Sequence, residues 1–347
     1  MADNLLRQLL RLPYRYVRYE LLPSLGHLAM SGRSPHRLLS RWPEGEMALG
    51  PKVCVYVHWD GAGEVRDHVL HHVRSLAEAG LSVVFVTNSG FLRPAAMAAL
   101  QGVCAGVLIR GNVGYDFGAW REGFEVLQLP RPDTEMVVMA NDSVYGPMRP
   151  LDDLIGAFDF SQADIWGCTE SWQTRYHLQS YLMAFSPRVV ASDAWRTFWA
   201  TVRPTWSKMW LVRLYEIGLT QSLLKAGFTC RAIWPYQRLV NDLDPELLTD
   251  HTEGGPNLAD PTVRVRQYHT RHIRNLSVAR LPLNPTSDLW RQLLQTQFPF
   301  IKRELLRDNP THVPDVAEWR DVARAQFSAN LQPIERDLQR TLKNRTP

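Results

Sequence analysis

Cysteine is scarce in this chain of 347 residues, and the four that occur lie far from one another in the sequence. None of them forms a C-x-x-C pair, so the spacing of zinc-binding and thiol redox motifs is missing. Isolated cysteines are typical of thiols that stay reduced inside a cell. We therefore expect a cytoplasmic location. The four are Cys54, Cys104, Cys168 and Cys230.

Long hydrophobic runs are also missing. No apolar stretch approaches the ~18 residues that a membrane-spanning helix needs. Arginines interrupt the leucines near the start, so we expect no signal peptide there. The net charge of +4 is mild and no recognisable nucleic-acid-binding motif accompanies it, so nucleic acid is not an expected partner.

What the sequence does contain is a regular alternation of short apolar runs and amphipathic segments. Apolar residues make up 45% of the chain, which is enough for a sizeable core. Strands are predicted at 53–57, 82–87, 107–109 and 136–140, with helices at 65–80, 94–101 and 117–127. Strands that alternate with helices favour right-handed crossovers. The predicted fold class is therefore α/β, with a mainly parallel sheet flanked by helices.

The second half is less regular. We predict strands at 164–168 and 177–185, helices at 192–202, 215–226 and 289–306, and an exposed helical tail from 316. Residues 241–286 are rich in Pro, Asp, Asn and Gly and are expected to form a long loop or lid. The chain then divides into a segment of residues 1–48, a domain of residues 49–240, and a lid with a helical extension at 241–347.

The first segment has a basic amphipathic pattern. Arg7, Arg11, Arg15 and Arg18 recur at helical spacing, and leucines and aromatic residues fall largely on another face. Such a helix can lie on an anionic membrane surface, which would make the protein peripheral on the cytoplasmic face. The alternative is a helix packed against the domain with its arginines in solvent.

Two polar clusters follow two of the predicted strands. Asn112, Gly114 and Asp116 come after the strand at 107–109, and Asn141-Asp142-Ser143 comes after the strand at 136–140. Ligands of open α/β sheets bind beyond the carboxyl ends of the strands. We therefore expect the two clusters to lie side by side and to bind a nucleotide sugar.

The second cluster suits a diphosphate. Asp142 is the candidate ligand of Mg²⁺ or Mn²⁺, since one or two carboxylates typically hold such an ion beside phosphate oxygens. Asn141 and Ser143 are candidates for hydrogen bonds to phosphate or ribose. The alternative is a plain strand-end turn, where these residue types are common because they bond local backbone.

The first cluster offers a donor loop. Gly114 would let the backbone approach the donor closely, and Asp116 would accept hydrogen bonds from ribose or sugar hydroxyls. Asp116 can equally cap the following helix. His177 has two readings as well, as a metal or phosphate contact or as a half-buried core histidine.

Several longer motifs carry a family resemblance. They are Asn112-Val-Gly-Tyr-Asp-Phe-Gly-Ala-Trp120, Asn141-Asp-Ser-Val-Tyr-Gly-Pro147, Asp164-Ile-Trp-Gly167, His177-Leu-Gln-Ser-Tyr181, Tyr215-Glu-Ile-Gly-Leu-Thr220 and Phe298-Pro-Phe-Ile-Lys-Arg-Glu-Leu-Leu306. In this order they resemble the rhamnan synthesis protein F family, over roughly residues 50–315. A broader resemblance is to glycosyltransferases of the GT-A fold.

The resemblance implies a function. It implies an inverting glycosyltransferase that moves a sugar from a nucleotide-sugar donor such as dTDP-L-rhamnose to a growing polysaccharide or lipid-linked saccharide. Glu216, at the predicted start of a helix, resembles the catalytic base of GT-A enzymes, and the helix dipole there would favour its ionised form. The acidic motif departs from the family pattern, because Asn141-Asp142-Ser143 has one carboxylate. The alternative is a non-catalytic module of the same fold that binds saccharide or a partner protein.

Overall fold

The computed structural model describes residues 37–204, 208–241, 243, 271–279, 281–313 and 315–342. The arginine stripe of the first segment and most of the predicted loop at 241–286 lie outside the described residues. Residues 271–278 are helical, which corrects the expectation of a loop there. No helix in the described ranges is both long and apolar enough to cross a membrane.

The centre of the molecule is a sheet with the strand order β1-β4-β3-β2-β5-β9-β7-β10, and β8 pairs with β7. Its strands are β1 (Leu38–Trp42), β2 (Lys52–His58), β3 (Ser82–Thr87), β4 (Gly106–Arg110), β5 (Met136–Asn141), β7 (Ile165–Ser171), β8 (His177–Leu178), β9 (Leu182–Phe185) and β10 (Cys230–Trp234). Strands β4, β3, β2 and β5 are mutually parallel, as are β7 and β10. Strand β9 runs antiparallel to both β5 and β7. The predicted α/β class with a mainly parallel sheet is confirmed.

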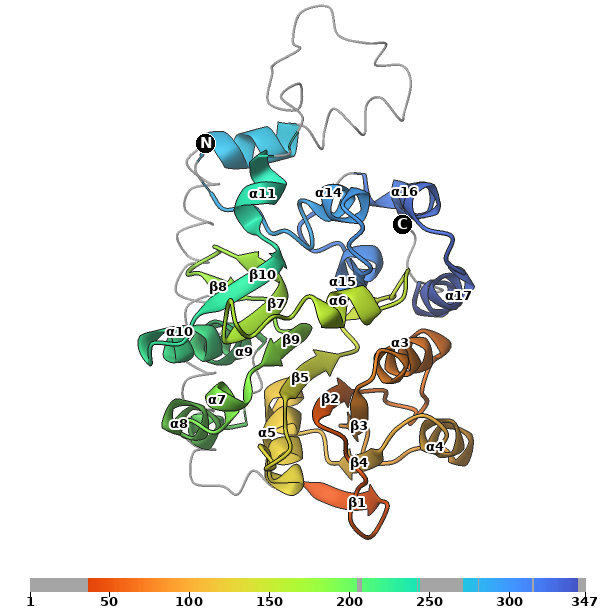
Figure 1. The fold of residues 1–347 in the computed structure, drawn as a ribbon. Coiled ribbons are helices and arrows are strands. Elements are labelled where there is room, and N and C mark those ends of the chain that lie inside the picture. The colour runs from red at the N-terminus through yellow and green to blue at the C-terminus, as the bar shows by residue number, and fades with distance from the viewer. Residues whose placement is uncertain are drawn as a thin grey trace, which may run out of the picture.

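Helices cover both faces of this sheet (Figure 1). On one face lie α3 (Asp67–Glu78) and α4 (Pro94–Gln101), and on the other α5 (Tyr115–Leu127), α8 (Asp193–Thr201) and α10 (Ile217–Lys225). The strands read as continuous apolar runs because both of their faces are buried. In β2, Val53, Val55 and Val57 pack with α5, whereas Cys54 and Tyr56 pack with α3. The remaining short helices are α6 (Asp152–Gly156), α7 (Pro187–Val190), α9 (Lys208–Leu211), η2 (Val212–Glu216) and α11 (Tyr236–Asn241).

Strand β1 lies inside the segment that we expected to stand apart from the domain. It pairs antiparallel with β4 at the edge of the sheet. The carboxylate of Glu122 on α5 accepts hydrogen bonds from the backbone N–H groups of Arg37 and Leu38, at 2.6 and 2.7 Å. The same carboxylate forms a buried ion pair with Arg110 at 2.6 Å. The sheet therefore begins before residue 49.

The prediction of one helix at 289–306 is wrong, because the middle of this range is not helical. The structure has α14 (Trp290–Gln295), then β11 (Ile301–Lys302) and α15 (Arg303–Arg307). The Phe298-Pro299-Phe300 stretch breaks the helix because proline has no backbone N–H and clashes with the preceding turn. Strand β11 pairs antiparallel with β6 (Val144–Tyr145), so that Lys302 lies opposite Val144. This pairing brings residue 302 to the end of β5.

The tail is helical as predicted, but it is not an exposed appendage. Helices η3 (Val316–Glu318), α16 (Trp319–Gln326) and α17 (Gln332–Thr341) bury Trp319, Ala323 and Leu338 in a hydrophobic cluster with Tyr145 and Trp290. Figure 1 shows α14 to α17 gathered beside α3. The amphipathic pattern of the tail therefore packs against the domain and holds β11 in place.

Candidate functional site

The two predicted clusters meet, although β3 and β2 lie between their strands. Asn141 Nδ2 at the end of β5 donates a hydrogen bond to Asp116 Oδ2 at the start of α5, at 2.8 Å. Asp116 is the second residue of α5, so the loop of residues 111–114 between β4 and α5 places it next to the end of β5. The rule that ligand loops gather at the carboxyl ends of parallel strands therefore placed these residues correctly.

The turn into α5 depends on glycine. Gly114 has φ of +82°, a left-handed conformation that glycine adopts without strain. A side chain at Gly118 would meet the backbone oxygen of Val113 at 2.8 Å, so the chain packs closely here. Arg110 Nη2 donates to that same oxygen at 3.0 Å and fixes the loop. Asn112 lies exposed at this turn.

Asn141 is engaged on both ends of its amide. Its nitrogen donates to Asp116, and its oxygen accepts from the backbone N–H of Ser143 at 3.1 Å and from Ser143 Oγ at 2.6 Å. The residue is 4% exposed. We interpret Asn141 as the group that positions Asp116 and Ser143 rather than as a direct contact to a ligand.

The sequence reasoning missed the cation at this site. Lys302 Nζ lies 3.4 Å from Ser143 Oγ and 5.4 Å from the ring centre of Tyr181. The side chain is half-buried, and its burial lowers the lysine pKa, whereas the charges of Glu216 and Glu304 raise it. Among the described residues, no carboxylate lies within the 4.0 Å of an ion pair with Lys302.

Asp116 has an unusual environment for a carboxylate. Its burial, together with the nearby charge of Asp142, raises its pKa to about 7, although the Asn141 amide and the Lys302 charge oppose the rise. A group with such a pKa exchanges protons near neutral pH, which is the range that favours general acid–base work.

Glu216 is not at a helix start, so that prediction was wrong. α9, η2 and α10 follow one another without a break, and Glu216 is the last residue of the π-helical turn η2. The dipole of a helix N-terminus therefore does not act on it. Glu216 Oε1 accepts a hydrogen bond from the backbone N–H of Ser180 at 3.0 Å. Single π turns within helices occur frequently at functional sites.

The predicted metal ligand already has a counterion. Arg303 Nη1 donates to Asp142 Oδ2 at 2.8 Å and to the Asp142 backbone oxygen at 2.6 Å. Arg303 also lies over the Tyr145 ring, and the Tyr145 hydroxyl donates to Asp337 Oδ2 at 2.6 Å. Within the described ranges, no group of three or more His, Cys, Asp or Glu side chains is arranged to hold a metal ion. The residues around Asp142 do not fit a divalent cation.

His177 lies away from this cluster. It begins β8, is 5% exposed, and its Nδ1 lies 2.8 Å from the backbone oxygen of Arg175. These contacts favour the reading of a buried core histidine over that of a phosphate contact.

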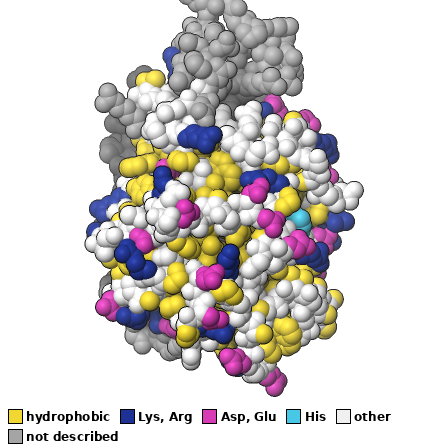
Figure 2. All heavy atoms as spheres, in the orientation of Figure 1, with side chains coloured by type: hydrophobic (Ala, Val, Ile, Leu, Met, Phe, Trp, Pro, Cys, Tyr) yellow, Lys and Arg dark blue, Asp and Glu magenta, His cyan; other side chains and the backbone are white. Residues whose placement is uncertain are grey.

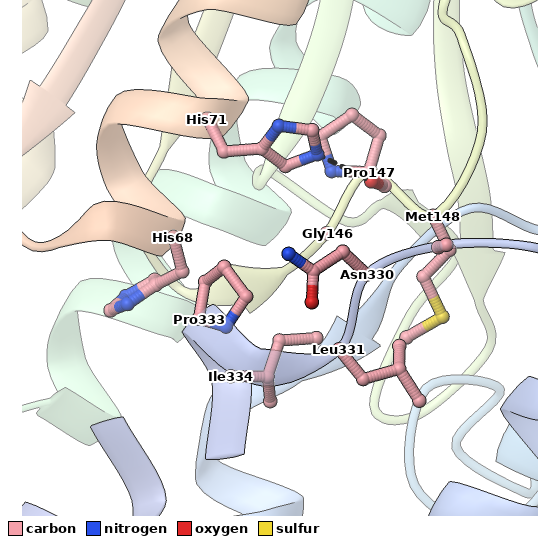
Figure 3. A pocket seen from close by; sticks show the side chains of 10 residues that line it. His68, His71, Gly146, Pro147, Met148, Asn330, Leu331, Pro333 and Ile334 are labelled. Atoms are coloured by element: carbon pink, nitrogen blue, oxygen red, sulfur yellow. Dashed lines mark hydrogen bonds between the residues drawn. The ribbon is translucent and has the colours of Figure 1, made fainter. Parts of the chain in front are cut away.

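A small recess lies on the α3 side of the molecule (Figure 3). It is lined by His68, His71, Gly146–Met148 and residues 329–331 with Pro333 and Ile334. Its free volume of about 10 Å³ has room for about one water molecule and none for a sugar. Burial lowers the pKa of His68 to about 4 and that of the neighbouring His72 to about 3, so both rings are neutral here. We interpret the recess as the seam between α3 and the C-terminal helices.

Charge is mixed on one face of the molecule. Figure 2 shows acidic and basic side chains interspersed over the face that it presents, without one large patch of either sign.

Comparison with known sequences finds one matching family model and several relatives. Residues 83–253 match the family model described as rhamnan synthesis protein F. The virulence protein VirA of Vibrio anguillarum is 31% identical over 217 residues, which are 61% of this chain and 66% of that protein. The uncharacterized protein y4gN of Sinorhizobium fredii is 26% identical over 224 residues, covering 63% and 55% of the two chains. The match thus spans just under two thirds of the first relative and about half of the second.

Comparison with solved structures gives weaker likenesses. A galactosyltransferase in complex with donor and acceptor sugar analogues has a TM-score of 0.36 at 9% identity, covering 81% of this chain and 98% of that one. A mannosyltransferase from Pyrobaculum calidifontis in complex with GDP-Man and Mn²⁺ has a TM-score of 0.31 at 12% identity, covering 93% and 88%. Likeness of this order assigns no residue, donor or metal to this chain.

Proposed function

Because residues 83–253 match the model of the rhamnan synthesis protein F family, we propose that this chain is a glycosyltransferase of polysaccharide synthesis. The proposed reaction transfers a sugar, with inversion, from a nucleotide-sugar donor to a saccharide or lipid-linked saccharide acceptor. We take dTDP-L-rhamnose as the first donor to test, since the resemblance to a rhamnan synthesis family motivates it.

One observation carries the proposal. Asp116, Ser143 and Lys302 converge on Asn141 and its neighbours at the carboxyl end of β5, with Glu216 close enough to influence the Lys302 charge. A structural turn needs no such gathering of charges from four distant parts of the chain. A nucleotide diphosphate beside a sugar offers both the anion and the hydroxyl groups that these side chains recognise.

The proposed chemistry is a single displacement. The acceptor oxygen forms a bond to the anomeric carbon as the bond to the diphosphate oxygen breaks, and the bonding electron pair leaves with the diphosphate. The acceptor proton goes to a carboxylate, for which we propose Glu216. General-base assistance of this kind is commonly worth ~10²–10⁴-fold in rate. Asp116, with its pKa raised to about 7, is the second candidate for this base.

A second function has its own support. The acidic motif has one carboxylate, Asp142, and Arg303 already pairs with it. Both facts favour a module that binds saccharide without turnover, because no carboxylate is then left to hold a catalytic metal ion. The test that separates the two is donor turnover with a panel of nucleotide sugars and oligosaccharide acceptors. Release of nucleoside diphosphate supports the transferase, whereas tight saccharide binding with no release supports the module.

We propose in addition that residues 1–22 bind anionic lipid, on the strength of the arginine spacing. At ~1 kcal/mol per basic residue near such a surface, four arginines provide a useful attraction that salt weakens. Flotation with vesicles of phosphatidylserine and phosphatidylcholine tests this, with the intact chain compared with one that lacks residues 1–22. Equal flotation of both chains, or of neither, contradicts the membrane role.

A further inference from the structure

The site has a second cation, Lys302, beside the residues where a metal ion was expected. Resting on the transferase proposed above, we propose that Lys302 binds the diphosphate of the donor and takes the role that a divalent cation has in other enzymes. Nucleotide binding by this chain is then independent of metal.

The first step concerns Asp142, the one carboxylate of the acidic motif. Its Oδ2 is 2.8 Å from Arg303 Nη1, and both side chains are 17% exposed. A metal ion at Asp142 would have to bind beside this arginine, or displace it and leave it beside the new cation. Repulsion between the two like charges would oppose such an exchange.

The second step concerns the free hydrogen-bonding capacity of Lys302. An ammonium group has three N–H donors. The structure gives Nζ one acceptor, Ser143 Oγ at 3.4 Å, and the face of the Tyr181 ring at 5.4 Å. No ion pair with another described residue uses its charge. Holding a half-buried cation without an anionic partner costs free energy, and an incoming anion relieves that cost.

The third step concerns how rigidly the lysine is held. Its backbone pairs with Val144 in the two-stranded sheet of β6 and β11. The next residue, Arg303, donates its backbone N–H to the Ser143 oxygen at 3.0 Å. Charge that is fixed in place before the reaction stabilises a leaving group without the cost of reorganisation. The negative charges of Asp116 and Glu216, which both act on Lys302, then disfavour anions that do not contact the lysine.

The chemical balance requires no further reactant. When the glycosidic bond breaks, its electron pair moves to the terminal phosphate oxygen, and negative charge grows there. Lys302 donates hydrogen bonds to that oxygen and keeps its proton. Since the charge grows during the reaction, the lysine contact strengthens toward the transition state.

The experiment is calorimetric titration of the full chain with dTDP, UDP, GDP, ADP and inorganic pyrophosphate, in EDTA and in excess Mg²⁺. The variants are Lys302→Met, Lys302→Gln and Lys302→Arg. Lys225→Met is the matched control, because Lys225 is exposed at the end of α10 and loses the same charge. Melting curves of all four variants establish that each is folded at the temperature of the titration.

We expect one nucleoside diphosphate to bind the parent equally in EDTA and in Mg²⁺. Lys302→Met and Lys302→Gln should lose tenfold or more in affinity, as expected when a charge-assisted hydrogen bond is removed. Lys302→Arg should retain most of the affinity, and Lys225→Met all of it.

Two results would overturn the inference while leaving the transferase standing. One is binding that EDTA abolishes and Mg²⁺ or Mn²⁺ restores, and the other is equal affinity in the parent and both neutral variants. A parent that binds none of the five probes under either condition would overturn the inference and the proposed function together.

Discussion

Asp116 and Asp142 stand at the same edge of the sheet, yet their surroundings differ. Asp142 has an arginine at 2.8 Å, whose position is secured by a tyrosine and a further aspartate. Asp116 has an amide at 2.8 Å and no cation within ion-pair distance among the described residues, and its pKa rises to about 7. One carboxylate is part of the scaffold, and the other is held in a state that costs stability.

This difference separates structure from function at the edge. Groups that are fully paired stabilise the fold, whereas strained or partly paired groups cluster at sites where a ligand completes them. The half with Asp116, Ser143, Lys302 and Glu216 is thus the half that we expect to meet the substrate. Four predictions follow, from the largest expected effect to the smallest; three test this division and one tests the seam between α3 and the C-terminal helices.

Removing the arginine of the paired half should cost most. Arg303→Met leaves Asp142 and Asp337 without their cation, and losing one partner of a largely buried ion pair costs about 3 kcal/mol of unfolding free energy. Chemical denaturation measures it. The matched control is Arg188→Met, whose partner is Asp164 and whose side chain is 66% exposed. The control should lose under about 1 kcal/mol. Equal losses in the two variants would show that the Asp142 pair is no scaffold.

Removing the proposed base from the other half should affect rate and leave the fold intact. Glu216→Gln keeps an oxygen for the Ser180 N–H, so donor binding and melting temperature should change little. Turnover should fall at least ~10²-fold, or about 2.7 kcal/mol. Glu125→Gln, an exposed change on α5, is the control. Turnover close to the parent rate would move the role of base to Asp116.

Acid should weaken the seam between α3 and the C-terminal helices. The folded pKa of His68 is lowered to about 4, below the ordinary 6.5, so its stability contribution is complete above pH 6.5 and is lost as the pH falls toward 4. At pH 5 this loss is about 2 kcal/mol. Both ring nitrogens lack hydrogen-bond partners among the described residues, so His68→Phe should reduce the acid sensitivity.

Denaturation at pH 7 and pH 5 measures the effect, with the exposed His312→Gln as control. If His68→Phe keeps the full acid sensitivity of the parent, the seam is not the acid-sensitive element.

Neutralising Asp116 should stabilise the protein. Its folded pKa of about 7 exceeds the ordinary 3.8, so its ionisation costs stability increasingly from about pH 4 to 7 and fully above that. Asp116→Asn should therefore gain about 1 kcal/mol at pH 8, after allowance for solvent screening, and little at pH 4. Asp142→Asn should lose stability at pH 8. Melting temperatures across this pH range give the comparison, and shifts of the same sign would abolish the contrast between the two carboxylates.

The part of this fold that could be predicted from the sequence is the part built from apolar runs, namely strands β2 to β5. The parallel strands β2 to β5 are buried on both faces, so the sequence predicts where they end. Those ends in turn predict that Asp116 lies near Asn141 and Ser143. The strand predicted at 177–185 is broken into β8 and β9 by a turn at Ser180 and Tyr181. Short-range patterns do not report such a turn.

The cations of the site could not be predicted from short-range patterns either. Lys302 and Arg303 reach it through β11, a strand of two residues whose partner β6 is distant in sequence. The apolar spacing of residues 289–306 continues through Pro299 and therefore wrongly predicted one continuous helix. One feature of the sequence argued against a continuous helix and for buried cations here. It is this proline, which has an aromatic residue on each side and two basic residues shortly after it. Glu216 was misplaced because nothing in the sequence marks a π turn that joins two helices.

The pairing of β11 with β6 also sets an order of events during translation. Ser143 and Lys302 are separated by 159 positions, so at ~5–20 residues per second the ribosome makes the serine about 8–30 s before the lysine. In that interval the parallel strands have been made and can pack, while the edge of β6 has no partner and the acidic groups have no cation. The nascent chain is therefore a folding core with an incomplete candidate site, and the site is completed only when β11 pairs with β6.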